Sequence, residues 1–263
     1  MTLFVRLAGA RIRSDWQYRT SFVFFMLSQA LITALEFVAL VLLLEVTPTL
    51  GGWNRSEVLL LYGLTAFPFA VCDVVVSSVG DVPTRIRQGT FDRLLLRPAS
   101  TLVQLLGDEF ALRRVGKLIP TGGALVIALA TVEIDWTPRR VALVVLTLIC
   151  GVLIYTAIWI ASAATAFWTV DSQEALNSMT YGGNFANQYP AHIYGRWFRM
   201  ILGWIIPLAF IAYVPSIAIL EPENPLGIPG WLVYLNPVVA AAAMAFALGA
   251  WRLGERRYQS TGS

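Results

Sequence analysis

Two acidic residues within long apolar stretches are the first candidates for chemistry in this sequence. Glu36 lies near the middle of one apolar stretch, and Asp73 lies near the end of the next. A charge in the hydrocarbon core is costly unless it is paired or hydrated, so an acid there indicates a functional site. Two interpretations of Glu36 stay open: a group that lines a transport pathway, or a protonated carboxyl bonded to a neighbouring helix. For Asp73, pairing with a loop arginine is favoured over contact with a substrate.

The residues that an enzyme or a metal site needs are scarce. His192 is the single histidine, and Cys72 and Cys150 both fall in apolar stretches, so neither a metal site nor a disulfide is predicted. No serine near a recognisable motif accompanies His192, which we interpret as an interfacial polar residue and not as part of a protease dyad. Residues 116–118 read GKL, without the Ser or Thr and the spaced glycines of a P-loop. We therefore predict no enzyme and no cofactor in this chain. If the chain takes part in ATP-driven transport, ATP and Mg²⁺ must bind a separate subunit.

A basic segment between the second and third apolar stretches has the character of a docking surface. Residues 80–100 read GDVPTRIRQGTFDRLLLRPAS, with four arginines and two acids. Pro83 suits the first turn of a short helix, Gly89 can end that helix, and Pro98 forces a second boundary. We expect a short basic helix here, then an amphipathic helix that leads into the next apolar stretch. The candidate contact residues in this segment are Asp81, Arg85, Arg87, Gly89, Phe91, Asp92, Arg93 and Arg97.

Membrane-spanning helices must position these residues, because 57% of the 263 residues are hydrophobic and only 13% are charged. A soluble domain has about 25% charged residues. A hydrocarbon core about 30 Å thick needs about 20 apolar residues per helix, whereas barrel strands would be short and alternating. The predicted fold is an all-α integral membrane protein with six transmembrane helices in one domain, residues 1–263. The predicted spans are residues 22–46, 58–79, 115–132, 141–168, 200–220 and 231–251.

Three segments outside these spans complete the predicted organisation. Residues 1–20 carry apolar side chains at roughly helical spacing with arginines between them, which favours an interfacial helix over an ordinary basic flank. Residues 80–114 form a cytoplasmic coupling segment between spans two and three. Residues 169–199 form a second cytoplasmic or interfacial segment, part of which could re-enter the membrane, because its Gly-Gly and Tyr-Pro pairs break helices.

Two prolines fall in the predicted fifth span. Pro207 and Pro215 would kink a membrane helix. Such kinks serve a pathway that opens, or they are static bends tolerated by packing, and both interpretations stay open. With Glu36 and Asp73, these prolines are the candidate residues of a substrate pathway.

The basic residues are distributed unevenly around the predicted spans. If both termini lie in the cytoplasm, only Arg55, Arg139 and Arg140 of the 19 basic residues fall outside. An excess of Lys and Arg in the cytoplasmic loops is the usual orientation signal. The first apolar run is too long for a cleavable signal peptide. We therefore expect a multi-pass protein with both termini in the cytoplasm.

Three sequence segments resemble the permease subunits of bacterial ABC-2-type exporters, in particular six-span, multidrug-type permeases. They are GTFDRLLLRPAS at residues 89–100, NSMTYGGNFANQYPAHIYGRWFR at residues 177–199 and IIPLAFIAYVPSIAIL at residues 205–220. The run FALRRVG that begins at Phe110 supports them. These segments occur in the order that the family shows, and the number of predicted spans also agrees.

The resemblance implies an ABCG-like (type V) transmembrane domain in a bacterial cytoplasmic (inner) membrane. Such a permease forms a homodimer or heterodimer among membrane lipids, and two cytoplasmic ATP-binding-cassette ATPase subunits dock on it without any nucleic acid. By resemblance, residues 81–98 would meet the ATPase. The implied function is export of an amphipathic or lipid-like compound, such as a drug or antibiotic, driven by ATP hydrolysis in the separate subunit. The alternatives are an ATP-independent secondary carrier or channel, or a membrane scaffold.

Overall fold

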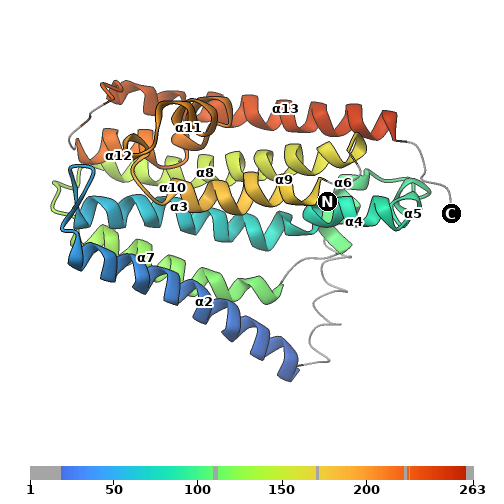
Figure 1. Cartoon of the computed structure of the whole chain (residues 1–263), viewed down its shortest axis with the longest axis horizontal. Coiled ribbons are helices and arrows are strands. Elements are labelled where there is room, and N and C mark those ends of the chain that lie inside the picture. Colours follow the sequence, from blue (N-terminus) through green and yellow to red (C-terminus); the bar gives the residue numbers. More distant parts are fainter. Residues whose placement is uncertain (1–18, 109–111, 170–171, 222–223, 225, 259–263) are drawn as a thin grey trace.

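The computed structural model describes residues 19–108, 112–169, 172–221, 224 and 226–258, and nearly all of them are helical (Figure 1). The interfacial helix predicted for residues 1–20 falls almost entirely outside the described residues. Within the described part, five helices are long and apolar enough to cross a membrane, so the prediction of an all-α membrane protein is confirmed. Their bounds are Arg19–Val46, Arg55–Arg87, Arg114–Thr131, Pro138–Phe167 and Gly230–Arg257.

The long helices pack as a bundle along the long axis of the molecule (Figure 1). Helix α3 packs against both α7 and α8, α13 runs along α8, and α2 packs against α7 and the turn before it. Gly116, in that turn, has no side chain to collide with the backbone carbonyl of Met26, which lets α2 approach closely. The bounds of these helices are Arg19–Val46 (α2), Arg55–Val76 (α3), Leu118–Thr131 (α7), Pro138–Ala164 (α8) and Asn236–Arg257 (α13).

Local signals in the sequence explain where two of these helices begin. The Asn54 side chain accepts a hydrogen bond from the N–H of Glu57 at 3.0 Å, and the Glu57 carboxylate accepts one from the N–H of Asn54 at 2.7 Å. This capping box starts α3. The Thr137 hydroxyl caps α8 by accepting a hydrogen bond from the N–H of Arg140 at 3.3 Å, and Pro138 occupies the first turn of the helix.

The two ends of the bundle carry different connections. At one end a two-stranded hairpin joins α2 to α3, with Thr49 opposite Asn54 and Leu50 opposite Trp53. Its strands are β1 (Thr49–Leu50) and β2 (Trp53–Asn54). We call this the hairpin end. At the other end lie α4 (Val82–Arg87), α5 (Asp92–Leu95) and α6 (Thr101–Asp108), and we call this the docking end.

The segment of residues 169–199 does not stay at the docking end but runs along the bundle to the hairpin end. Helix α9 (Gln173–Asn177), a π-helical turn (Ser178–Gly182) and α10 (Gly183–Asn187) follow one another without a break. Leu176 lies beside Gly80 at the docking end, whereas His192 bonds to the carbonyl of Gly51 at the hairpin end. The chain therefore crosses the bundle here. Gly182 and Gly183 do not break the helix, since both adopt helical dihedrals.

Residues 200–220 do not form the single long helix predicted as the fifth span. Helix α11 (Arg196–Phe198) continues into a π-helical stretch (Arg199–Ile205), and the backbone then leaves the helix at Ile206 and Pro207. A short 3₁₀ turn (Leu208–Phe210) and α12 (Tyr213–Leu220) follow. The segment is a bent excursion at the side of the bundle (Figure 1). Pro207 has no N–H to continue the helix. The buried side-chain amide of Asn236 donates to the carbonyl of Phe210, in the 3₁₀ turn that follows, at 2.9 Å.

Candidate functional site

The predicted docking segment folds as a compact unit of short helices. Pro83 lies in the first turn of α4, as its position in the sequence predicts. Gly89 follows with φ of +66°, a left-handed conformation that favours glycine, and the N–H groups of Thr90 and Phe91 bond to the carbonyl of Arg85. This turn ends α4 and leads into α5, which packs on α6.

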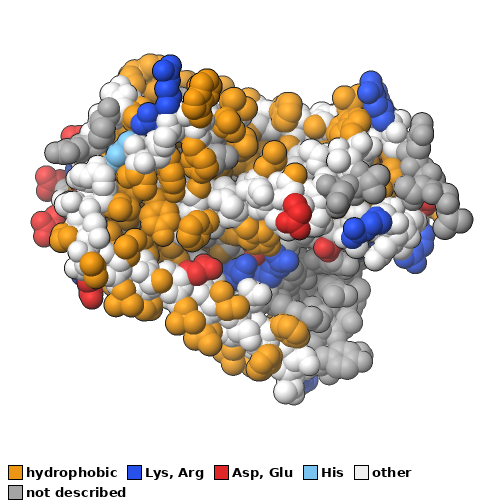
Figure 2. Space-filling view, viewed as in Figure 1, with side chains coloured by type: hydrophobic (Ala, Val, Ile, Leu, Met, Phe, Trp, Pro, Cys, Tyr) orange, Lys and Arg blue, Asp and Glu red, His pale blue; other side chains and the backbone are white. Residues whose placement is uncertain are grey.

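One side of this unit is exposed, and its side chains are both basic and apolar. Arg87, Arg93 and Arg97 are exposed, and between the last two lie Leu95 (44% exposed) and Leu96 (84% exposed). We call these five residues the arginine–leucine face. Lys and Arg side chains are visible at this end of the molecule in Figure 2. The arginines were predicted from the sequence, whereas the two leucines were not singled out, although the run LLL between two arginines was available as a signal.

Phe91 was predicted to contact the partner, but it is fully buried. Its ring packs edge-on against Phe167 at the end of α8 and against Tyr258 after α13, at 5.3 and 5.1 Å between centroids. Phe167 also packs on Trp251 of α13, at 5.2 Å. Gly254 leaves the space that the Phe167 ring fills. This aromatic cluster of Phe91, Phe167, Trp251 and Tyr258 fixes the docking segment to the ends of α8 and α13.

Hydrogen bonds reinforce the aromatic cluster. The buried Thr101 hydroxyl donates to Glu255 at 2.6 Å and accepts from the indole N–H of Trp251 at 3.3 Å. The Tyr258 hydroxyl donates to Asp92 at 2.8 Å. Burial, with Asp92 nearby, raises the pKa of Tyr258 to about 12, so the phenol stays a donor. The docking segment is therefore joined to α8 and α13 by ring contacts and by hydrogen bonds.

Replacing Thr101 with valine is expected to destabilise the protein by about 1–3 kcal/mol. The hydroxyl is buried, and its loss leaves the Trp251 N–H and the Glu255 carboxylate without their partner, which costs about this much for buried groups. The measurement is the unfolding temperature of the purified protein in detergent. Thr101→Ser keeps the hydroxyl and serves as the control. Equal unfolding temperatures for wild type and Thr101→Val would contradict the assigned network.

Asp73 is fully buried and is paired on both carboxylate oxygens. Arg114 donates to Oδ1, and the Lys117 ammonium lies 2.7 Å from Oδ2. The Tyr181 hydroxyl, which accepts from Arg114 at 2.6 Å, lies 3.2 Å from Oδ1. Asp73 therefore ties α3 to the start of α7 and to the π-helical turn, while its place in a substrate pathway stays a prediction. The expected pairing with a loop arginine is found at Arg114.

Aromatic rings surround this charged cluster. Tyr181 packs edge-on against Phe69 and Trp159, at 5.5 and 5.4 Å between centroids, and Lys117 lies over its ring at 5.7 Å. Tyr181 belongs to the π-helical turn between α9 and α10. Such turns frequently mark functional positions inside helices. Here the turn carries Tyr181, whose hydroxyl reaches the Asp73 carboxylate.

A second polar cluster joins three connections at the hairpin end. The Gly51 carbonyl accepts from Nε2 of His192 at 2.6 Å, so Nε2 carries the proton and Nδ1 accepts from the Tyr213 hydroxyl at 2.9 Å. Trp53 stacks on Tyr213 at 5.3 Å. Burial lowers the pKa of His192, as Arg199 does, although the bond to Gly51 opposes the change. This neutral imidazole holds the excursion of residues 196–220 against the hairpin.

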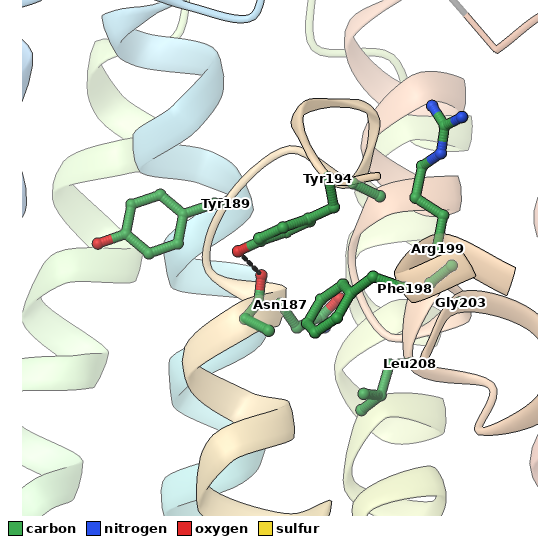
Figure 3. A pocket seen from close by; sticks show the side chains of 10 residues that line it. Asn187, Tyr189, Tyr194, Phe198, Arg199, Gly203 and Leu208 are labelled. Atoms are coloured by element: carbon green, nitrogen blue, oxygen red, sulfur yellow. Dashed lines mark hydrogen bonds between the residues drawn. The ribbon is translucent and has the colours of Figure 1, made fainter. Parts of the chain in front are cut away.

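A small concavity of about 30 Å³ opens between α10 and the excursion (Figure 3). Tyr194 crosses it and donates to the carbonyl of Ala186 at 2.8 Å. Arg199 and Phe198 line the side opposite to Tyr189, whose ring extends away from them in Figure 3. The predicted fifth-span prolines lie near this region: Pro207 at the break, and Pro215 buried inside α12.

Glu36 is the second intramembrane acid, and its situation is opposite to that of Asp73. It lies on an exposed part of α2, and among the described residues it makes no hydrogen bond or ion pair. Nor do the described residues include a group of three or more His, Cys, Asp or Glu side chains placed to hold a metal ion. Glu36 is thus the unpaired acid of the described membrane-spanning helices.

Comparison with known proteins gives one match. A protein-family model described as "ABC-2 family transporter protein" matches residues 30–262, which is most of the chain. The match includes the docking segment, the buried Asp73 cluster and the excursion at the hairpin end. Searches of curated proteins and of solved structures found no match.

Proposed function

Since the chain belongs to the ABC-2 family of transporter proteins and is therefore a membrane component of an ABC transporter, we propose that it is the permease subunit of an exporter. In this proposal a separate ATPase subunit binds the docking end and hydrolyses ATP. The compound moved is amphipathic or lipid-like, such as a drug or antibiotic, in keeping with the apolar, aromatic-rich helices. The permease pairs with a second permease, identical or related, above two ATPase subunits.

The observation that carries the proposal is the arginine–leucine face at the end of a rigidly anchored segment. Leu95 and Leu96 expose apolar surface that a soluble partner would bury, and the arginines beside them suit an acidic rim. The segment also continues directly from α3 through a 3₁₀ turn, Ser77–Asp81. Movement of a bound ATPase would therefore shift α3, and through the aromatic cluster α8 and α13, as one unit.

The orientation follows from the same proposal. If the docking end faces the cytoplasm, then the N-terminal end of α2 and the C-terminal end of α13 lie on the cytoplasmic side of a bacterial inner membrane. The helix from α9 to α10 supplies the sixth crossing, in place of residues 200–220. Arg196 and Arg199 then lie on the outer side, which reduces the charge asymmetry between the two sides without removing it.

Charge reversal at Arg87 and Arg93 is expected to weaken ATPase association at least ten-fold, because both arginines are exposed on the face that would meet the partner. The measurement is co-purification of the ATPase with tagged permease, followed by ATP hydrolysis and ATP-dependent transport in vesicles. Arg55→Glu combined with Arg196→Glu adds the same charge at the hairpin end and is the matched control. Transport that proceeds without any ATPase would reject the proposal in favour of a secondary carrier.

A further inference from the structure

The exposed position of Glu36 calls for a partner outside the described chain. It lies ten residues before the end of α2 at Val46, or about 15 Å at 1.5 Å per residue, which is near the middle of a bilayer. Side chains of α2 that surround it, such as Leu35 and Val38, are exposed and apolar. A carboxylate directed into lipid at this depth is unfavourable, so such residues pair with another group or face water.

Polar residues and aromatic rings gather near this carboxylate. Thr33 and Gln29 precede Glu36 by three and seven residues, so the three side chains follow one face of α2. On the next residue, the Phe37 ring packs on the buried Tyr62 of α3 at 5.4 Å. Thr33 is buried, so the exposed surface here is the Glu36 carboxylate, close to the point where the Phe37 ring meets α3.

Two accessible rings lie in and just after α10, which packs against α3. One turn after Tyr62, the Thr65 hydroxyl donates to the carbonyl of Asn187 at 3.0 Å, which places the end of α10 against α3. Tyr189 is half-buried, and it packs at 5.7 Å on Phe185, which is 61% exposed. Rings of this kind, together with a carboxylate, form the usual surroundings of an organic cation in a protein.

The basic residues of the described spans cannot supply the missing charge at this depth. They lie at the ends of the helices, and Arg114 and Lys117 are already paired with Asp73. A second copy of these spans would therefore bring no cation to the middle of the membrane. A positively charged, amphipathic ligand would supply a counter-charge at this depth.

We propose that Glu36 is the counter-ion of a binding site for amphipathic organic cations on the α2–α3 face, with the rings of Phe185 and Tyr189 beside it. This inference rests on the proposed export function and narrows its substrate to positively charged amphipaths. A neutral or anionic lipid would leave the Glu36 carboxylate uncompensated. The site lies closer to the hairpin end than the Asp73 cluster does.

Tetraphenylphosphonium and tetraphenylborate, which have nearly the same shape and opposite charge, test the site. Binding of each is measured to the full-length chain in lipid nanodiscs. Glu36→Gln is expected to weaken tetraphenylphosphonium binding at least ten-fold and to leave tetraphenylborate binding unchanged, and Glu36→Asp should restore part of the affinity. Glu174→Gln removes an exposed acid near the docking end and is the matched control.

Two results would overturn the site. One is equal tetraphenylphosphonium affinity in wild type and Glu36→Gln. The other is quantitative cross-linking of Glu36→Cys to a second copy with no effect of the probe, which would make this face a subunit contact. Neither result touches the export proposal, which depends on ATPase association and ATP-driven transport. Conversely, charge-selective binding without ATPase association would support the site and reject the exporter.

Discussion

Replacing Asp73 with alanine is expected to remove most of the folded protein from the membrane. The substitution leaves Arg114 and Lys117 without their counter-ion, and Lys117 is only 17% exposed. Removing one partner of a buried ion pair costs about 3–5 kcal/mol. We expect a value toward the lower end, because about a third of the Arg114 side chain reaches solvent, which screens its charge. The measurements are the amount of protein in membranes and the unfolding temperature in detergent.

A charge-neutral variant distinguishes lost pairing from lost packing. Asp73→Asn combined with Arg114→Met and Lys117→Met removes the whole charged cluster and should recover much of the stability, because replacing a buried ion pair by apolar groups is often neutral. Asp73→Asn alone keeps the size of the side chain and should be nearly as harmful as Asp73→Ala. Wild-type abundance and unfolding temperature for both single variants would show that the cluster does not stabilise the fold.

The second large effect is expected at Leu96. Leu96→Asp places a charge at the most exposed apolar position of the arginine–leucine face and should weaken ATPase binding by about 2 kcal/mol, the usual threshold of an interface hot spot, or roughly thirty-fold. ATP hydrolysis coupled to transport should fall accordingly. The measurement is the affinity of the purified ATPase for permease in nanodiscs.

Val46 provides the control for Leu96, because both side chains are 84% exposed. Val46 lies at the end of α2 near the hairpin, so Val46→Asp adds the same charge far from the docking segment. We expect unchanged ATPase affinity for this variant. If Leu96→Asp and Val46→Asp bind the ATPase equally well, the partner does not use the arginine–leucine face.

The helix boundaries of the docking segment could be predicted from the sequence, because the residues that start and end its helices act through local backbone conformation. Pro83 and Gly89 have conformational requirements that hold in any context, and both stand where they were expected. The direction of each side chain could not be predicted, since it depends on what packs beneath. Phe91 is buried only because Phe167 and Tyr258 approach from segments far along the chain.

The path of residues 173–187 along the bundle could not be predicted from hydropathy. Residues 173–187 contain Asn, Gln and Gly, and their polarity is satisfied by partners elsewhere: Thr65 donates to the carbonyl of Asn187, and Tyr155 donates to Asn184. Residues 200–220 are apolar but turn back at Pro207. Hydropathy measures whether a segment tolerates lipid, and it does not tell whether the segment crosses the membrane or returns.

The pairing at Asp73 also constrains how the protein is made. Asp73 leaves the ribosome 41 residues before Arg114 and 44 residues before Lys117. During synthesis α3 therefore reaches the membrane while Asp73 is still unpaired. Its partners Arg114 and Lys117 are synthesised only later, just before α7. An unpaired Asp73 disfavours stable insertion of α3 on its own. We therefore expect α3 and α7 to enter the bilayer together as a helical hairpin, and the docking segment is the connection that remains outside the bilayer.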